Sequence, residues 1–221
     1  MQDKLYVRQV AVLGAGVMGA QIAAHCVNAG FKTLLFDLAQ EEGGRNKIVE
    51  GAVKRLADLK PTPLAYRQSN LKIECCNYDD DLTKLTECTL VIEAIAERLD
   101  LKLALYERII PFLDKDAYLV SNTSGLSVTE LAQNIPKSLQ SRFCGVHFFN
   151  PPRYMHLVEL IPSAYTTAQT LNQLEAWLVS MLGKGVVRAK DTPNFIANRI
   201  GVFSLLATVH HAARFNLNPS T

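Results

Sequence analysis

The sequence offers little that would point to a metal, a disulfide framework or a highly charged partner. Its five cysteines are odd in number and form no Cys-x-x-Cys pair, so neither disulfides nor a zinc site is expected, and a reducing compartment fits best. Lys and Arg total 23 against 21 Asp and Glu, which gives a formal charge of +2. We therefore expect no nucleic-acid partner, and any anionic ligand must be bound by a local site.

Long hydrophobic runs are also missing. No stretch approaches the roughly 18 apolar residues of a membrane span, and only about nine residues precede the first apolar run, too few for a signal peptide. No internal repeat or low-complexity tract is visible. With 48% hydrophobic and 20% charged residues, the 221-residue chain has the composition of a globular protein. We expect a cytoplasmic protein that does not bind membranes.

Strand and helix patterns alternate along most of the chain. The expected strands are residues 10–13, 33–36, 71–74, 90–94 and 118–121, and the expected helices between them are 17–29, 44–59 and 101–110. A short helix follows Ser127, which has the capping-box pattern with Glu130. Strands at 143–149 and 157–161 are separated only by a Pro-containing turn, which predicts an antiparallel pair, and a helix at 171–181 precedes a last strand at 186–189. The pattern predicts an α/β fold of Rossmann type, doubly wound, with a mostly parallel sheet and an antiparallel extension.

A glycine motif, Gly14-Ala15-Gly16-Val17-Met18-Gly19, lies between the first strand and the first helix, where this otherwise weak pattern indicates a dinucleotide site. Gly14 would permit the turn, Gly16 would let a pyrophosphate approach the helix, and Gly19 would allow close packing. Asp37 ends the second strand and can accept hydrogen bonds from ribose hydroxyls. Its charge, with no arginine directly behind it, favours NAD over NADP, while FAD and a turn without ligand stay open.

We place a domain boundary near residue 191. Residues 1–190 form the expected dinucleotide-binding domain, and from Pro193 onward the pattern is helical with no strand after it. The chain then ends abruptly. We therefore expect 191–221 to be the first helix of a truncated, all-α C-terminal domain.

Two polar residues, His147 and Glu159, stand inside apolar strands. Burial of a lone carboxylate is costly, so Glu159 needs a partner, and an imidazole on the adjacent strand would supply one. Such a pair is a general base, because the carboxylate fixes the tautomer and leaves the other ring nitrogen free to take a proton. A purely structural pair in the core is the alternative.

Other polar residues have less specific settings. Ser124 follows a strand at the expected carboxyl edge of the sheet, where ligands bind, although it also suits an ordinary turn. Glu93, at the end of another strand, either faces the nicotinamide or is a solvated carboxylate. Asn198 and Arg199 either face the other domain or lie on a helix surface. No histidine or cysteine stands at ligand spacing, so no metal site is expected.

The chain resembles the L-3-hydroxyacyl-CoA dehydrogenases of fatty-acid β-oxidation over nearly its whole length. The resemblance rests on five motifs in the family's order: the glycine motif, Val91-Ile92-Glu93-Ala94, Ser121-Asn122-Thr123-Ser124, His147-Phe148-Phe149-Asn150-Pro151, and 191–199 with Asp-Thr-Pro and Phe-Ile-Ala-Asn-Arg. It implies His147 as catalytic base, Glu159 as its orienting acid and Ser124 and Asn198 as substrate-positioning residues. It also implies a substrate contact at Asn150 and cofactor contacts at Gly14, Gly16, Val17, Met18, Gly19, Asp37, Glu93 and Asn122.

The implied function is NAD-dependent oxidation of an L-3-hydroxyacyl-CoA by a homodimer formed through the absent C-terminal domain. The run 151–159 looks closest to bacterial multifunctional members in which the dehydrogenase precedes an enoyl-CoA hydratase region. Asn194 replaces a usual Gly, and Arg98 a common Asn near the cofactor. Lys47, Lys54 and Arg55 either contact CoA phosphates or form a solvated helix face. The alternatives are a non-catalytic NAD-binding module and a dehydrogenase of a non-CoA 3-hydroxy acid.

Overall fold

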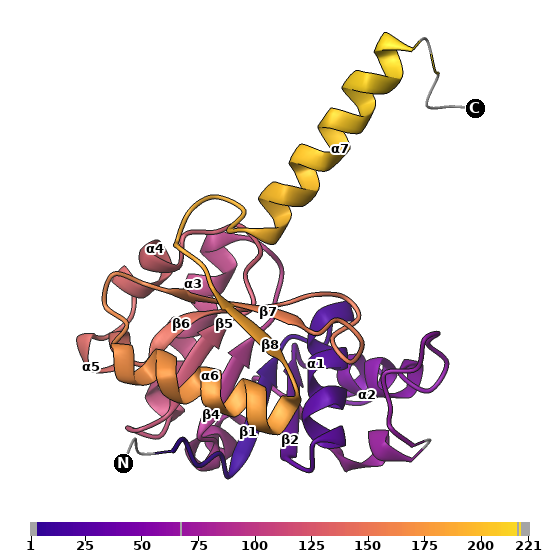
Figure 1. The fold of residues 1–221 in the computed structure, drawn as a ribbon. Helices are drawn as coiled ribbons and strands as arrows, with labels where there is room; N and C mark the ends of the chain where they lie inside the picture. Colours follow the sequence, from indigo (N-terminus) through magenta and orange to yellow (C-terminus); the bar gives the residue numbers. More distant parts are fainter. Residues whose placement is uncertain (1–3, 67, 216, 218–221) are drawn as a thin grey trace.

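The computed structural model describes residues 4–66, 68–215 and 217. Within them a single eight-stranded sheet has the order β3-β2-β1-β4-β5-β6-β7-β8 (Figure 1). The strands are β1 (Gln9–Leu13), β2 (Lys32–Asp37), β3 (Ile73–Asn77), β4 (Leu90–Glu93), β5 (Tyr118–Ser121), β6 (Phe143–Phe148), β7 (Leu157–Pro162) and β8 (Gly185–Arg188). The helices are α1 (Val17–Asn28), α2 (Lys47–Arg55), α3 (Leu99–Ile109), α4 (Val128–Gln133), α5 (Lys137–Gln140), α6 (Ala168–Leu182) and α7 (Ala197–Arg214), with short 3₁₀ turns η1 (Ser69–Lys72), η2 (Leu82–Glu87) and η3 (Ile110–Phe112).

The sheet is parallel from β3 across to β6. The strand order reverses between β1 and β4, and such a reversal opens a crevice at the carboxyl ends of the strands. β7 then pairs antiparallel with β6, and β8 pairs parallel with β7. The predicted fold class and the predicted antiparallel extension are both confirmed.

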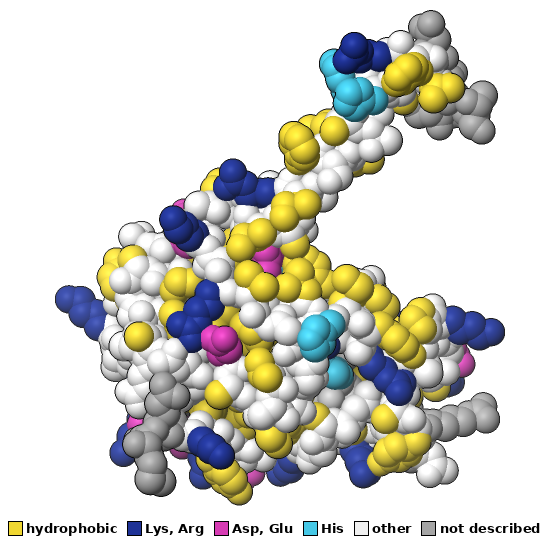
Figure 2. Space-filling model, viewed as in Figure 1, with side chains coloured by type: hydrophobic (Ala, Val, Ile, Leu, Met, Phe, Trp, Pro, Cys, Tyr) yellow, Lys and Arg dark blue, Asp and Glu magenta, His cyan; other side chains and the backbone are white. Residues whose placement is uncertain are grey.

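Helix α7 differs from the other long helices because it runs away from the sheet (Figure 1), and none of its residues is buried. Hydrophobic side chains lie along it in Figure 2. The large exposed ones are Ile200, Val202, Phe203, Leu205, Leu206 and Val209. No helix in the described part of the chain is both long and apolar enough to cross a bilayer. The division into domains near residue 191 stays a prediction.

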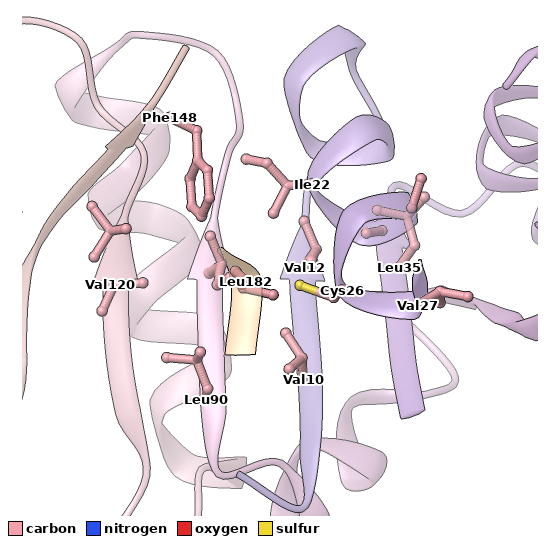
Figure 3. Packing of buried hydrophobic residues seen from close by; sticks show 14 of the residues in the cluster. Val10, Val12, Ile22, Cys26, Val27, Leu35, Leu90, Val120, Phe148 and Leu182 are labelled. Carbon is pink, nitrogen blue, oxygen red and sulfur yellow. The ribbon is translucent and has the colours of Figure 1, made fainter. Parts of the chain in front are cut away.

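The core lies on both faces of the sheet, because successive side chains of a strand point to opposite faces. Val10 and Val12 of β1 belong to the cluster beneath α1, α2 and α6, part of which is shown in Figure 3. Ala11 and Leu13 belong to the cluster beneath α3 and α4. This two-sided burial explains why β1 reads as a continuous apolar run.

Several predicted boundaries were wrong for local reasons. Helix α2 is shorter than the predicted 44–59, since the backbone beyond it closes into tighter turns, with Ala57 donating to the carbonyl of Lys54. Strand β3 begins at Ile73 because η1 occupies the preceding residues. Helix α7 begins at Ala197 rather than Pro193, because Asn194 (φ 63°) and Phe195 (φ 49°) are left-handed and cannot belong to a right-handed helix.

Candidate active site

The glycine loop has the geometry that the motif predicts. Gly14 has φ 102°, and a Cβ there would lie 2.7 Å from the carbonyl oxygen of Ala94. A Cβ on Gly19 would lie 1.8 Å from the carbonyl oxygen of Gly14, so only glycine lets α1 pack this closely. Gly16 is the N-cap residue of α1, and the space where its Cβ would stand is open. The loop therefore leaves the helix N-terminus accessible to an anionic group.

A cavity of about 470 Å³ opens beside this loop at the reversal of strand order. Its lining residues are Gly14, Gly16, Asp37, Leu38, Tyr78, Ala94, Ile95, Ala96, Leu101, Ala104, Leu105 and Arg108. The Asp37 carboxylate accepts hydrogen bonds from the backbone N–H groups of Ala15 (2.6 Å) and Leu38 (2.7 Å). A largely apolar slot with one carboxylate at its rim and a bare helix N-terminus suits the adenosine half of a dinucleotide.

Val17 and Met18 are not among the residues that line this cavity. Val17 is 68% exposed at the first position of α1, while Met18 packs against the core cluster under the helix. Cofactor contact by their side chains stays a prediction. Their backbone N–H groups belong to the helix N-terminus that the glycine loop exposes.

Glu93 is completely buried rather than solvated, so that alternative was wrong. One carboxylate oxygen accepts from Lys102 Nζ (2.6 Å) and the N–H of Ile95, and the other accepts from the hydroxyls of Tyr106 (2.9 Å) and Ser121 (2.6 Å). Both oxygens are therefore occupied within the protein. These contacts hold Glu93 rigidly at the end of β4, and its predicted position beside the nicotinamide stays a prediction.

Glu97, which the sequence did not single out, organises the turn after β5. Its Oε1 atom accepts from Thr123 Oγ1 (2.6 Å), from the N–H groups of Ser124 (2.7 Å) and Gly125 (2.8 Å), and from Ser124 Oγ (3.2 Å). Burial alone would raise the pKa of Glu97, but these hydrogen bonds and nearby Lys102 lower it below its ordinary value. The sequence could have indicated this role, because Glu97 follows β4 closely and the Ser124 turn follows the neighbouring strand β5 at the same edge of the sheet.

His147 and Glu159 lie directly opposite each other in the antiparallel register of β6 and β7. His147 Nδ1 is 2.8 Å from Glu159 Oε2, and the two residues are 5% and 1% exposed. The imidazole also contacts two aromatic rings, with centroids 4.4 Å away for Phe149 and 5.8 Å away for Phe195. These contacts fix the ring and leave Nε2 as the nitrogen available to a ligand.

The second oxygen of Glu159 has different partners. Oε1 accepts from the backbone N–H groups of Ile196 (2.9 Å) and Ala197 (2.8 Å), which lie at the N-terminus of α7. The carboxylate is thus hydrogen-bonded on both oxygens, as a buried carboxylate must be.

The remaining predicted residues fall into two groups. Ser124 and Asn198 are brought together, because Asn198 Nδ2 donates to the carbonyl oxygen of Ser124 (3.2 Å). Asn122 and Asn150 flank the end of β6: Asn122 Oδ1 accepts from the N–H of Phe148 (2.9 Å), and Asn150 Oδ1 accepts from Gln21 Nε2 on α1 (3.1 Å). Their predicted contacts with cofactor and substrate stay predictions.

Asn194 and Arg98, the two departures from the family pattern, both occupy positions that the local structure explains. Asn194 is left-handed, a conformation that Asn tolerates better than most residues, so it can stand where Gly is usual. Arg98 pairs with Asp100 (2.5 Å) at the exposed start of α3 and is not among the cavity-lining residues. Lys47, Lys54 and Arg55 are exposed on α2, which leaves both interpretations of that helix face open.

No group of three potential metal ligands is found among residues 4–66, 68–215 and 217. All five cysteines are free thiols. Burial raises the pKa of the Cys88 thiol to about 11 and that of Cys76 to about 12, which disfavours the reactive thiolate. The described site is therefore built from imidazole, carboxylate, hydroxyl and amide groups.

Residues 9–192 match the family described as "3-hydroxyacyl-CoA dehydrogenase, NAD binding domain". The chain belongs to this family. NAD is accordingly the cofactor of this 3-hydroxyacyl-CoA dehydrogenase NAD-binding domain, in agreement with Asp37 and the open helix N-terminus at Gly16.

Relatives of this dehydrogenase domain include separate enzymes and parts of larger ones. It is 44% identical over 219 residues to the "Putative fatty acid oxidation complex trifunctional enzyme" of Rickettsia prowazekii, covering 99% of this chain and 30% of that protein. It is 40% identical over 215 residues to a "Probable 3-hydroxyacyl-CoA dehydrogenase" of Deinococcus radiodurans, covering 97% of this chain and 62% of that protein. The chain thus spans less than two thirds of the length of these relatives.

A solved structure shows the same fold. The crystal structure of (S)-3-hydroxybutyryl-CoA dehydrogenase from Ralstonia eutropha has a TM-score of 0.74 and 34% identity, covering 88% of this chain and 68% of that chain.

Proposed function

We propose that the chain is the NAD-binding part of an NAD-dependent L-3-hydroxyacyl-CoA dehydrogenase that acts in fatty-acid β-oxidation. The observation that carries the proposal is the buried contact between His147 Nδ1 and Glu159 Oε2, 2.8 Å long. It combines a general base with a family whose chemistry is oxidation of a 3-hydroxyacyl-CoA.

The pair has a direct use in this reaction. Glu159 holds the proton of His147 on Nδ1, so the basic Nε2 takes the proton of the substrate 3-hydroxyl. In the reverse direction the imidazolium returns that proton to the forming alcohol. A bound NAD would supply the hydride acceptor for C3, while the residues of this chain handle the proton.

Ser124 and Asn198 hold the substrate oxygen, and Asn150 lies beside the reacting groups. The Ser124 N–H donates to Glu97, and Asn198 donates to the Ser124 carbonyl. These hydrogen bonds position both residues before substrate binds. Orientation by such preformed groups supplies a large part of the rate enhancement.

The properties of the whole protein belong to the same proposal. The exposed apolar side chains of α7 support a homodimer formed through the region that α7 begins, which would also complete the acyl-CoA site. A cytoplasmic location, the absence of nucleic-acid and membrane partners, and fusion to an enoyl-CoA hydratase region remain predictions from the sequence.

Turnover with matched substrates tests the proposed function. NADH oxidation by the full-length protein that contains this chain is followed with acetoacetyl-CoA and, separately, with acetoacetate. We expect reduction of acetoacetyl-CoA and little reduction of the free acid. A preference for acetoacetate would indicate a dehydrogenase of a non-CoA acid, and tight NADH binding without turnover of either would indicate a non-catalytic module.

A further inference from the structure

Glu159 is the only side chain that caps α7 within the described residues. The N-cap residue Ile196 makes no side-chain capping bond, and the N–H groups of the N-cap and of the first helical residue donate instead to Glu159 Oε1, at 2.9 Å for Ile196 and 2.8 Å for Ala197. The other oxygen of the same carboxylate holds His147 Nδ1 at 2.8 Å. One buried carboxylate therefore joins an 18-residue helix to the catalytic base.

The segment that delivers these N–H groups, which we call the 191–198 strap, is fastened at both ends. At its start, the Asp191 carboxylate accepts from the N–H groups of Val128 (2.9 Å) and Thr129 (2.8 Å) and from Ser127 Oγ (3.0 Å). At its end, Asn198 donates to the carbonyl of Ser124. The strap thus spans the space between the Ser124 turn and the His147–Glu159 pair.

The backbone of the strap is unusual at the point of contact. Asn194 and Phe195 have φ angles of 63° and 49°, and although Asn tolerates this left-handed region, it is unfavourable for a bulky residue such as Phe195 and persists only where surrounding contacts require it. The same turn buries Phe195, 2% exposed, against the His147 ring. The left-handed backbone, the contact of Phe195 with the His147 ring and the amide donors to Glu159 therefore lie in one short segment beside the catalytic pair.

Three donors fix the Glu159 carboxylate, which therefore cannot rotate without breaking a charge-assisted hydrogen bond. The two N–H groups at the N-terminus of α7 therefore help to set the orientation of the carboxylate that contacts His147. A displacement of α7 would withdraw two of the three donors at once. By reciprocity, a change at the carboxylate must alter how firmly the N-terminus of α7 is held.

We propose that the N-terminus of α7 is a positioning element of the catalytic pair, so that the orientation of α7 and that of His147 are coupled through Glu159. The proposal rests on the proposed function for its catalytic meaning. The coupling itself is a property of the 221-residue chain and is measurable without turnover.

Amide hydrogen exchange tests one direction of the coupling. In Glu159→Gln, we expect exchange at the Ile196 and Ala197 amides to accelerate by at least about tenfold, because two bonds to a charged acceptor become bonds to a neutral one. The control is Asp191→Asn, which should accelerate exchange at Val128 and Thr129 without the same effect at 196 and 197. Unchanged exchange at 196 and 197 in folded Glu159→Gln would overturn the proposal.

The other direction uses proline, which lacks an N–H. Ala197→Pro removes one donor to Glu159 at the first helical position, whereas Arg199→Pro introduces proline in the same turn without removing such a donor. The effect on the His147–Glu159 hydrogen bond is measured from the NMR resonance of the His147 Nδ1 proton, which appears at low field when the proton is bonded to a carboxylate. We expect it to shift or broaden in Ala197→Pro and to persist in Arg199→Pro.

Equal resonances in both folded proline variants would contradict the coupling. If Ala197→Pro does not fold, the exchange measurement on Glu159→Gln decides alone. Coupling without dehydrogenase turnover would overturn the proposed function but not the structural link between α7 and His147. Turnover without coupling would overturn the positioning role of α7 but not the proposed function. The two failures are therefore distinguishable.

Discussion

At the scale of single residues, the contrast between Gly16 and Gly19 separates a ligand requirement from a packing requirement. An added Cβ is unobstructed at Gly16 but would overlap the Gly14 carbonyl from Gly19. We expect Gly16→Ala to keep the free energy of unfolding within about 1 kcal/mol while weakening NADH binding by roughly tenfold or more, since the methyl group occupies the approach of the pyrophosphate. Gly19→Ala should lower both the free energy of unfolding and the affinity for NADH. NADH fluorescence titration and urea unfolding measure these effects, and wild-type affinity in Gly16→Ala would refute the assignment.

Asn194 offers a second test at this scale. Because its φ is 63°, a β-branched residue is strained there, whereas glycine is not. We predict that Asn194→Val lowers the free energy of unfolding by about 1–3 kcal/mol and that Asn194→Gly changes it little. Equal stability of the Val and Asn proteins in urea would show that the strap adopts another backbone conformation in solution.

The candidate site shows how far sequence reasoning reaches at the residue scale. The contact between His147 and Glu159 was predictable, because a polar residue in each of two adjacent apolar strands must find a partner. Glu93 and Glu97 could not be told apart, since both lie at the carboxyl edge near β4. Only the packing of Lys102 and Tyr106 from α3 decides that Glu93 is buried and that Glu97 holds the Ser124 turn.

At the scale of secondary-structure elements, the contact between α1 and the end of α6 should make stability depend on pH. His25 on α1 is hydrogen-bonded to the Leu182 carbonyl, and burial, with nearby Lys184, lowers its pKa from 6.5 to about 4. The folded state therefore binds fewer protons than the unfolded state between these two values. Stability is full above about pH 6.5 and falls as pH decreases towards 4, by at most about 1.4 kcal/mol per pH unit.

Urea unfolding of His25→Gln across this pH range measures that contribution. The variant should lose stability less steeply than the wild type as pH falls from 6.5 to 4, because the group that must be protonated has been removed. If the plots of unfolding free energy against pH are parallel for the two proteins, the pKa of His25 is not lowered in the folded state.

The element order and the reversal of direction at β7 followed from sequence, because a short turn cannot make a parallel crossover. Boundaries were less predictable where backbone conformation overrides hydrophobic spacing. The apolar pattern from residue 193 onward suits a helix, yet the strap stays non-helical through Ile196 because Glu159 and His147 hold it there.

At the scale of the whole molecule, the cavity beside the glycine loop is lined by residues between Gly14 and Arg108, whereas α7 projects away from the sheet with its apolar side chains exposed (Figures 1 and 2). We predict that the 221-residue chain binds NADH but turns over acetoacetyl-CoA poorly, since the apolar side chains of α7 are exposed and the chain covers only 30% and 62% of two related proteins. Titration and turnover of the same preparation check this. Near-normal activity would show that the rest of the protein is dispensable.

The most direct test of the central claim is the rate of NADH oxidation with acetoacetyl-CoA by His147→Gln in the full-length protein. The account predicts a loss of about 10²–10⁴-fold in kcat with unchanged NADH affinity, because only proton transfer is removed. His156→Gln, which alters an exposed histidine outside the pair, serves as the matched control. Equal rates for His147→Gln and wild type would contradict the assignment of His147 as the base.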